Sequence, residues 1–262
     1  MKKEIYQGCL AVLRDELVPA MGCTEPVAVA YAAALARKTL GAIPDKVDVA
    51  VSGNILKNVK SVIVPNTDGM RGIPAAVAAG IVAGNEEAKL EVLASITQND
   101  RVNISNYLTR CVISVEQSDT GCVFDIGITC YSGHEYSFVR ITGSHTNVVR
   151  IERNGEVLFD KDASEEHTGM LAQFKSDLTV QDIVDFADCV DLADVEDMLE
   201  RQIEYNSAIA KEGLKNDYGA RIGKILIDAF GDDVHNRAKA TAAAGSDARM
   251  NGCELPVVIV SG

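Results

Sequence analysis

The sequence predicts an α+β fold in which helices at both ends of the chain flank an inserted antiparallel sheet. Three observations indicate this fold. Apolar residues recur at helical spacing before residue 44, short segments alternate apolar and polar residues between 102 and 160, and helical spacing returns beyond residue 163. We therefore expect an N-terminal helical segment at 1–44, an α+β domain with the antiparallel sheet at 45–162, and a C-terminal helical region at 163–262.

The composition predicts a soluble acidic protein of the cytoplasm. Of the 262 residues 47% are hydrophobic and 24% charged, which supports a sizeable core. The net charge of -13 disfavours nucleic acid and anionic membranes as partners, and no apolar run reaches the ~20 residues of a membrane span. The seven cysteines are scattered without a CxxC pair, which is typical of reduced thiols. Any metal site must therefore combine distant segments.

The N-terminal segment predicts two helices separated by a turn that presents Cys23. The first helix is indicated by apolar residues that end before Pro19: Ile5, Leu10, Leu13 and Leu17. Thr24 is a suitable N-cap for the second helix, and the nearly uncharged run 27–40 should be buried. A thiol at a helix N-terminus has a lowered pKa and suits a metal or an anion. The alternative is a buried structural cysteine.

Between residues 45 and 97 the pattern predicts one strand and two further helices. Residues 46–52 alternate apolar and polar side chains, as a strand does, and residues 66–69 have the composition of a turn. Small apolar residues at 73–83 predict a closely packed helix, with Gly84 as its C-cap. Residues 85–97 predict an amphipathic helix with acidic residues in its first turn.

From residue 102 to 160 the pattern predicts a meander of antiparallel strands. The strand segments are 102–117, 122–132, 135–142 and 147–159, and turn residues separate them. Asn154-Gly155 is a strong hairpin signal inside the last segment. Cys122 and Cys130 are eight residues apart in one predicted strand, so we expect both on one face, packed in a core.

Beyond residue 160 the sequence predicts a boundary followed by helices only. Residues 161–176 are polar and irregular, which favours a domain boundary there. Helices are predicted at 179–187, 194–212, 219–230 and 233–244. The apolar run 257–260 is followed by Ser261-Gly262 without a cap or a polar tail, so we expect further chain to follow in the complete protein.

Six motifs in a fixed order resemble the L-cysteine desulfidase family, which is related to the iron–sulfur L-serine dehydratases. They are GCTEP at 22–26, SGNILKN at 52–58, VPNT at 64–67, GIP at 72–74, GSHTN at 143–147 and GSDARMNG at 245–252. The resemblance covers nearly the whole chain. It implies β-elimination of L-cysteine to hydrogen sulfide, ammonia and pyruvate, with a [4Fe–4S] cluster as Lewis acid.

The resemblance also implies a set of cluster ligands that this chain holds only in part. The family uses three cysteines, one in GCTEP and two in a later helical region, so only Cys23 maps onto a ligand position here. The remaining ligands are expected outside this chain. The chain is accordingly interpreted as a gene fragment or as one half of a split enzyme. The expected partners are a separate chain that supplies the missing helical region, or further copies of this chain in a homo-oligomer.

His145, in the GSHTN motif, is the candidate catalytic base, because an imidazole is the usual group for removing an α-proton near neutral pH. The alternative is a turn histidine that hydrogen-bonds its own loop. The other histidines, at 134, 167 and 235, lie in polar stretches and are expected at the surface.

An amino-acid substrate also needs donors for its carboxylate and acceptors for its ammonium group. The polar residues in family-like motifs that could bind it are Thr24, Glu25, Asn54, Lys57, Asn58, Thr146, Asn147, Ser246 and Arg249. Each of them could instead belong to a turn, a cap or a first helical turn. In particular, Ser246-Asp247 follows an Ala-rich helix where a C-cap is expected.

Two rival functions remain open. One is an L-serine dehydratase, in which hydroxide leaves in place of sulfide. The other is a non-catalytic remnant or subunit that retains the sheet without the cluster. Nucleotide chemistry is disfavoured, since neither a GxxxxGK loop nor a GxGxxG that opens a helix is present.

Overall fold

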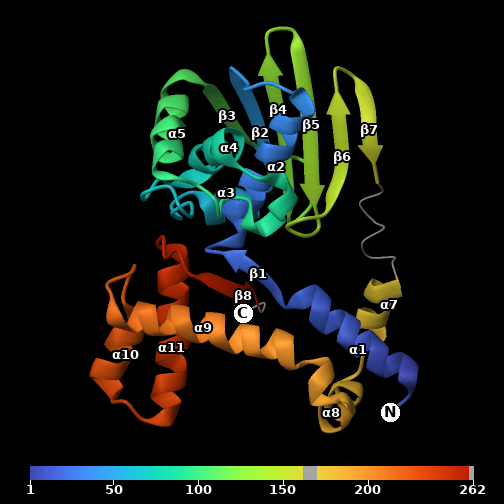
Figure 1. The fold of residues 1–262 in the computed structure, drawn as a ribbon, viewed down its shortest axis with the longest axis vertical. Helices are drawn as coiled ribbons and strands as arrows, with labels where there is room; N and C mark the ends of the chain where they lie inside the picture. Colours follow the sequence, from blue (N-terminus) through green and yellow to red (C-terminus); the bar gives the residue numbers. More distant parts are fainter. Residues whose placement is uncertain (162–169, 260–262) are drawn as a thin grey trace.

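A computed structural model describes residues 1–161 and 170–259 and confirms the mixed fold of helices and sheet. The central sheet has the strand order β3-β2-β4-β5-β6-β7 (Figure 1). Its strands are β2 (Lys46–Val51), β3 (Val112–Gln117), β4 (Asp125–Ser132), β5 (Glu135–Thr142), β6 (Val148–Arg153) and β7 (Glu156–Asp160). The meander β4 to β7 is antiparallel as predicted, but β2 and β3 run parallel, so the sheet is mixed.

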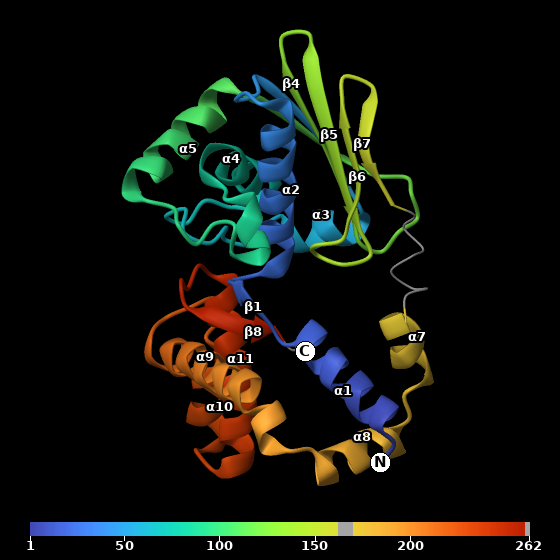
Figure 2. The same ribbon diagram turned by 45° about the vertical axis from the view of Figure 1, so that its right-hand side comes forward.

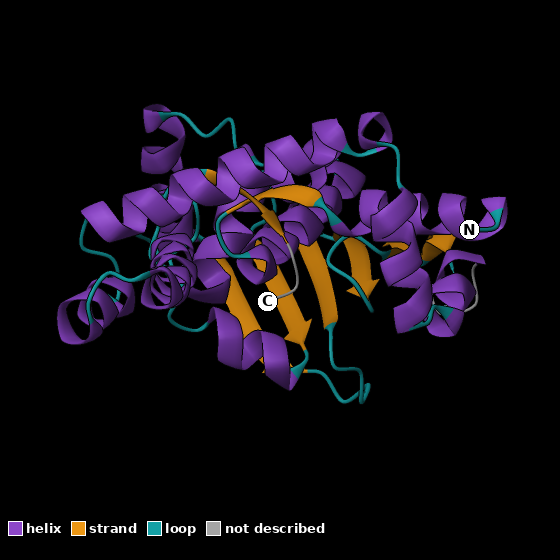
Figure 3. Cartoon of the chain, turned by 90° about the horizontal axis from the view of Figure 1, so that it is seen from below, coloured by secondary structure: helices purple, strands orange, loops and turns teal. Residues whose placement is uncertain are grey.

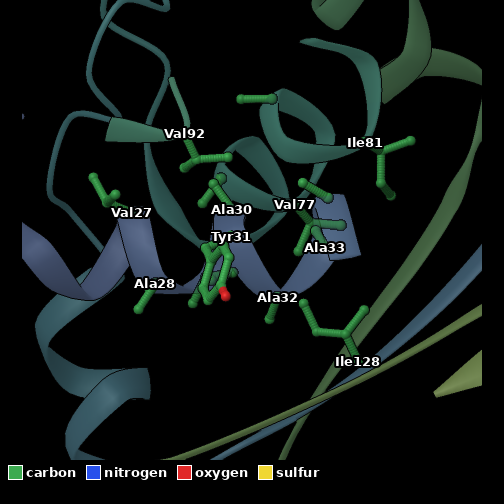
Figure 4. Packing of buried hydrophobic residues seen from close by; sticks show 14 of the residues in the cluster. Val27, Ala28, Ala30, Tyr31, Ala32, Ala33, Val77, Ile81, Val92 and Ile128 are labelled. Atoms are coloured by element: carbon green, nitrogen blue, oxygen red, sulfur yellow. The ribbon is translucent and has the colours of Figure 1, made fainter. Parts of the chain in front are cut away.

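Helix α2 (Thr24–Leu40) lies between this sheet and helix α4 (Gly72–Ala83), as Figure 2 shows. Figure 4 shows the small side chains that make this possible: Ala28 and Ala32 point towards the sheet, while Ala30 and Ala33 point towards α4. A helix with neighbours on opposite sides has no solvated face, which explains its lack of charge. Helices α3 (Gly53–Val59) and α5 (Gln98–Arg110) complete this part.

The remaining helices gather below the sheet in Figure 1, and Figure 3 views the chain from that side. They are α1 (Lys3–Glu16), α7 (Met170–Asp177), α8 (Val180–Cys189), α9 (Glu196–Lys215), α10 (Ile222–Phe230) and α11 (Val234–Met250). Helix α1 packs against α7 and α8, although it is remote from them in sequence. None of the helices in the described ranges is both long and apolar enough to cross a membrane.

A small antiparallel sheet brings two distant segments of the described chain together. Strand β1 (Val18–Met21) pairs with β8 (Pro256–Ile259), in the register Val18 to Ile259. The predictions treated 18–21 as part of a turn, because Pro19 ends the preceding helix. Half of the predicted boundary at 161–176, residues 162–169 with His167, lies outside the described residues, as do the last three residues. Residues 170–176 belong to helix α7, so the prediction of an irregular segment is wrong there.

Two predicted elements near residue 100 are wrong. Residues 86–91 form a short 3-10 helix and 92–95 form turns, because the backbone kinks at Lys89, where φ is +49°. Residues 102–110 belong to helix α5 rather than to a strand. That helix begins with a capping box in which Thr97 and Asp100 bond to each other's backbone N–H groups. The capping box outweighs the β-branched residues that suggested a strand.

Three smaller predictions are also wrong. Cys122 lies in an exposed loop before β4, so it does not share a strand face with the buried Cys130. Ser246 lies inside α11, which continues to Met250, and is therefore not a C-cap. Thr24 is the first residue of α2 rather than its N-cap, and Cys23 holds the N-cap position without a side-chain capping bond.

Candidate functional site

A tight turn at Gly22 and Cys23 leads from β1 into α2 and places the thiol in the interior. Gly22 has a φ of +64°, and a Cβ atom there would lie 2.6 Å from Cγ of Pro65. Only glycine combines that backbone conformation with such a close approach. Cys23 follows in an extended conformation with its side chain 5% exposed. The GCTEP motif therefore buries Cys23 between the sheet part and α11, whose Arg249 carbonyl is close to Gly22.

Glu25, in the first turn of α2, connects the polar residues around Cys23. Cys23 Sγ donates to Glu25 Oε2 at 2.9 Å, and Asn58 Nδ2 in α3 donates to Oε1 at 3.4 Å. Thr24 Oγ1 lies 3.4 Å from Oε2. Burial raises the pKa of the Glu25 carboxyl, but these hydrogen bonds and the nearby His145 outweigh burial, so its pKa lies below its usual value. Glu25 is therefore a carboxylate near neutral pH.

The Cys23 thiol is strongly held in its protonated form. Burial first, and then the charge and hydrogen bond of Glu25, raise its pKa to about 12, while Arg249 acts in the opposite direction. The expectation of a lowered pKa at the helix N-terminus is therefore wrong, because burial beside a carboxylate outweighs the helix dipole. A thiol in this setting ionises when a cation binds to it, since metal coordination displaces the proton.

His145 lies in the loop between β5 and β6, close enough to Glu25 for each group to influence the pKa of the other. Its ring packs against Phe124 with centroids 4.7 Å apart and an interplanar angle of 60°. Burial lowers the pKa of the imidazole, and the charge of Glu25 opposes that shift only in part. His145 is thus a neutral imidazole at neutral pH, the form in which it can accept a proton. No motif indicated Phe124, because a single aromatic residue before a strand carries no distinctive pattern.

Arg249 approaches Cys23 from the last turn of α11. Its charge lowers the pKa of the Cys23 thiol, which places the guanidinium within electrostatic reach of the thiol. Its Nε is buried and has no hydrogen-bond partner among the described residues. A buried unpaired donor is uncommon because it loses its hydration without compensation. Arg249 therefore has a free donor for an anionic group at this site.

The structure separates the other predicted substrate-binding residues from this group. Asn54, Lys57 and Ser246 are exposed, and within the described part of the chain none of them forms a hydrogen bond with Cys23, Glu25 or His145. Asn147 Nδ2 donates to the Thr142 carbonyl at 2.9 Å, so that side chain braces the loop of His145. Thr146 lies half-buried in the same loop.

A separate small pocket of about 130 Å³ lies where the VPNT loop meets the end of α11. Residues 63, 64 and 66–69, together with Asn251, Gly252 and Glu254, line it. Its polar groups already have partners: Asn66 Nδ2 donates to the Leu93 carbonyl, and Arg101 binds Asp68 at 2.6 Å and Glu254 at 3.3 Å. The VPNT and GSDARMNG motifs thus join the central sheet and its helices to the lower group of helices, which is a structural role.

The described residues provide one cysteine for an iron–sulfur centre, and not a complete ligand set. In residues 1–161 and 170–259 no group of three or more His, Cys, Asp or Glu side chains is placed to hold a metal ion. The other buried cysteines, Cys9, Cys130 and Cys253, belong to three different apolar clusters, none of which contains Cys23. Cys23 fits as a single ligand, but a whole cluster does not fit the described chain.

Comparisons with known proteins extend over most of the sequence. The family model described as "Serine dehydratase alpha chain" matches residues 87–262. The UPF0597 protein DSY1109 of Desulfitobacterium hafniense is 52% identical over 257 residues, which is 98% of this chain and 60% of that protein. A UPF0597 protein of Lachnoclostridium phytofermentans is 45% identical over 258 residues, with 98% of this chain and 61% of that protein covered.

The UPF0597 protein FN1147 of Fusobacterium nucleatum is 40% identical over 258 residues, which is 97% of this chain and 60% of that protein. The chain thus spans about three fifths of the length of the curated relatives it matches. No solved structure matches it.

Proposed function

Because the chain belongs to the serine dehydratase alpha-chain family, we propose that it carries the cysteine-bearing half of the active site of a β-eliminating lyase. Our first candidate substrate is L-cysteine. The observation that supports the proposal is the group formed by Cys23, Glu25, Asn58, His145 and Arg249, which come from four motifs of the sequence. The activity is proposed for the longer or partnered protein.

The proposed reaction removes the α-proton and the β-thiol group of L-cysteine. Hydrogen sulfide leaves, aminoacrylate remains, and water converts its imine form to pyruvate and ammonia. L-serine is the second candidate, with water as the leaving molecule, and the description of the matched family favours it. The ordered motifs of the sequence favour L-cysteine.

His145 is proposed as the base that takes the α-proton. The support for this role is its lowered pKa, which leaves an imidazole nitrogen free to accept a proton at neutral pH. Replacing His145 by Gln keeps a side chain of similar polarity that cannot act as a base. We expect this variant to lose activity by a factor of about 10²–10⁴, and the exposed His134→Gln to retain it.

Arg249 and Glu25 are proposed to bind the two charged groups of the amino acid. The unpaired Nε of Arg249 would donate to the substrate carboxylate. The Glu25 carboxylate would accept from the ammonium group, with Asn58 and Thr24 holding it in position. The exposed Asn54, Lys57 and Ser246, and Thr146 and Asn147 in the His145 loop, remain weaker candidates for substrate binding.

An iron–sulfur centre, on which this family generally depends, is part of the proposal, with Cys23 as one ligand. The remaining ligands would come from outside the described residues, since those do not supply them. Whether the centre is a [4Fe–4S] cluster is decided by anaerobic iron and acid-labile sulfide analysis after reconstitution, with Cys23→Ala as the control.

The experiment for the function is an anaerobic assay of the reconstituted chain, alone and co-expressed with the part of DSY1109 that lies outside its match to this chain. Sulfide and pyruvate are measured with L-cysteine, and pyruvate with L-serine. Equal amounts of sulfide and pyruvate from L-cysteine are expected. Formation of pyruvate from L-serine, with no sulfide or pyruvate from L-cysteine, would overturn the assignment of L-cysteine as the substrate. An iron-loaded preparation that forms pyruvate from neither amino acid would favour a non-catalytic subunit.

A further inference from the structure

Helix α10 and the start of α11 expose large apolar side chains that nothing in the described chain covers. Ile222 is 47% exposed, Ile225 54%, Phe230 68% and Val234 88%. We call these four residues the α10 stripe. Exposed apolar side chains that gather into a large patch mark sites of contact with a partner.

Ile222 and Ile225 do not lie on the face through which α10 packs on its own chain. That face centres on Gly223, where a Cβ would lie 2.4 Å from the Ala240 carbonyl oxygen of α11. Lys224, on a third side, is bonded to Asp217 and to the Lys215 carbonyl. Ile222 and Ile225 are one helical turn apart and lie away from both contacts. Figure 1 places α10 at the outer edge of the lower helices.

The α10 stripe begins next to the end of α11, the helix that carries Arg249 of the candidate site. The Ile222 N–H donates to Asp247 Oδ2 at 2.8 Å, and Asp247 is two residues before Arg249 in α11. A Cβ at Gly219 would lie 2.5 Å from Nδ2 of Asn251, so the start of α10 is packed tightly against the end of α11. A molecule on the α10 stripe would therefore lie close to the segment that carries Arg249.

We propose that the α10 stripe is the docking surface for an amphipathic helix of the polypeptide that corresponds to the unmatched part of the curated relatives. The chain covers 60% of DSY1109, which leaves 100% − 60% = 40% of that protein unmatched. Ile222 and Ile225, three residues apart on one side of α10, suit contact with the apolar face of another helix. The inference concerns assembly and does not depend on the reaction proposed above.

The test is co-expression of the 262-residue chain, tagged, with the untagged part of DSY1109 that lies outside the match. Complex formation is measured by copurification and light scattering, and the α10 amides are followed by hydrogen exchange. Ile225→Asp and Phe230→Asp place a charge on the stripe. Leu158→Asp on β7 is the matched control, because Leu158 is 54% exposed, as Ile225 is. Circular dichroism of each variant alone establishes that it folds.

We expect a one-to-one complex for the wild type and for Leu158→Asp, with slowed exchange in α10. The two stripe variants should weaken the complex at least about tenfold, as substitutions of buried interface anchors do. Absence of a complex, or a complex unaffected by Ile225→Asp, would overturn the proposal. So would a concentration-dependent dimer of the chain alone that Ile225→Asp abolishes, because the occupant would then be a second copy.

Discussion

Cys23 is a potential ligand whose surroundings keep it protonated until a cation arrives. Its thiol is buried, donates to a carboxylate, and has a pKa of about 12. The Glu25 carboxylate disfavours the free thiolate through charge repulsion. Once a cation is bound to the thiolate, the positive charge of the cation offsets this repulsion. These surroundings therefore predict low reactivity of Cys23 in the metal-free chain and also suit it as a metal ligand.

This setting predicts the order in which the cysteines react. In the metal-free chain at neutral pH, iodoacetamide should modify the exposed Cys122 and Cys189 well before Cys23, because the thiolate is the reactive form and burial restricts access. Mass spectrometry of timed samples measures the order. Modification of Cys23 at the rate of Cys122 would contradict the buried, protonated thiol.

His145 predicts a dependence of stability on pH. Its folded-state pKa is lowered from 6.5, chiefly by burial, so the unfolded chain binds a proton more readily than the folded chain does. Its contribution to stability is therefore present above about pH 6.5 and is lost as the pH falls through the lower folded-state value. Wild type should lose more stability than His145→Gln between about pH 7.5 and about pH 5.5.

Thermal unfolding of the two proteins across that range measures the difference, with the exposed His134→Gln as the control. If His134→Gln and His145→Gln respond to pH in the same way, His145 is not the group responsible.

At the scale of elements, the contact between α2 and α4 depends on Gly80. A Cβ at Gly80 would lie 2.1 Å from the Ala30 carbonyl oxygen, which is closer than any real contact. The two helices can therefore approach only because position 80 has no side chain. This close approach fills the core with alanine and valine side chains from both helices.

Two Gly-to-Ala substitutions distinguish this packing effect from helix propensity. Gly80→Ala should destabilise the protein by about 1–3 kcal/mol, since the added methyl forces the helices apart. Gly245→Ala in α11 should stabilise it by up to about 1 kcal/mol, because a Cβ there meets nothing closer than 3.8 Å. Urea denaturation followed by circular dichroism measures both. Equal effects of the two substitutions would refute the packing explanation.

At the scale of the whole molecule, β1 and β8 connect the two parts of the described chain. The pair is short, and Asn206 of α9 reinforces it by bonding both backbone groups of Val258, at 3.1 Å to the carbonyl and 3.0 Å to the N–H. Because Gly22 follows β1 directly, the pairing also fixes where Cys23 lies relative to α11.

The two hydrogen bonds from Asn206 to Val258 form a clamp on β8, and its removal should increase local opening of that strand. Asn206→Ala leaves two backbone groups of a buried residue without partners, at a cost of about 1–3 kcal/mol, and should speed hydrogen exchange of the β8 and β1 amides. Asn216→Ala is the control, because Asn216 is exposed and, among the described residues, bonds only to Glu212. Unchanged exchange in Asn206→Ala would show that the strands hold together without the clamp.

Local sequence patterns were sufficient to predict the elements that depend on neighbouring residues. The buried α2 and α4, the hairpin at Asn154-Gly155 and most of the late helices follow from periodicity and turn residues. The motifs also placed Cys23, Glu25, Asn58, His145 and Arg249 among the candidates. Prediction failed where the local signal was ambiguous. At 102–110 the β-branched residues suggested a strand, but the capping box at Thr97 and Asp100 begins a helix.

The tertiary structure alone decided which candidates meet and how they ionise. No sequence pattern pairs β1 with β8 or packs α1 against α7, because such contacts depend on segments far apart in the chain. The pKa of Cys23 is likewise set by burial and by a carboxylate, and the helix dipole predicted the opposite direction. Residue type and local spacing fix which groups are available, whereas folding fixes the distances and the dielectric that control their chemistry.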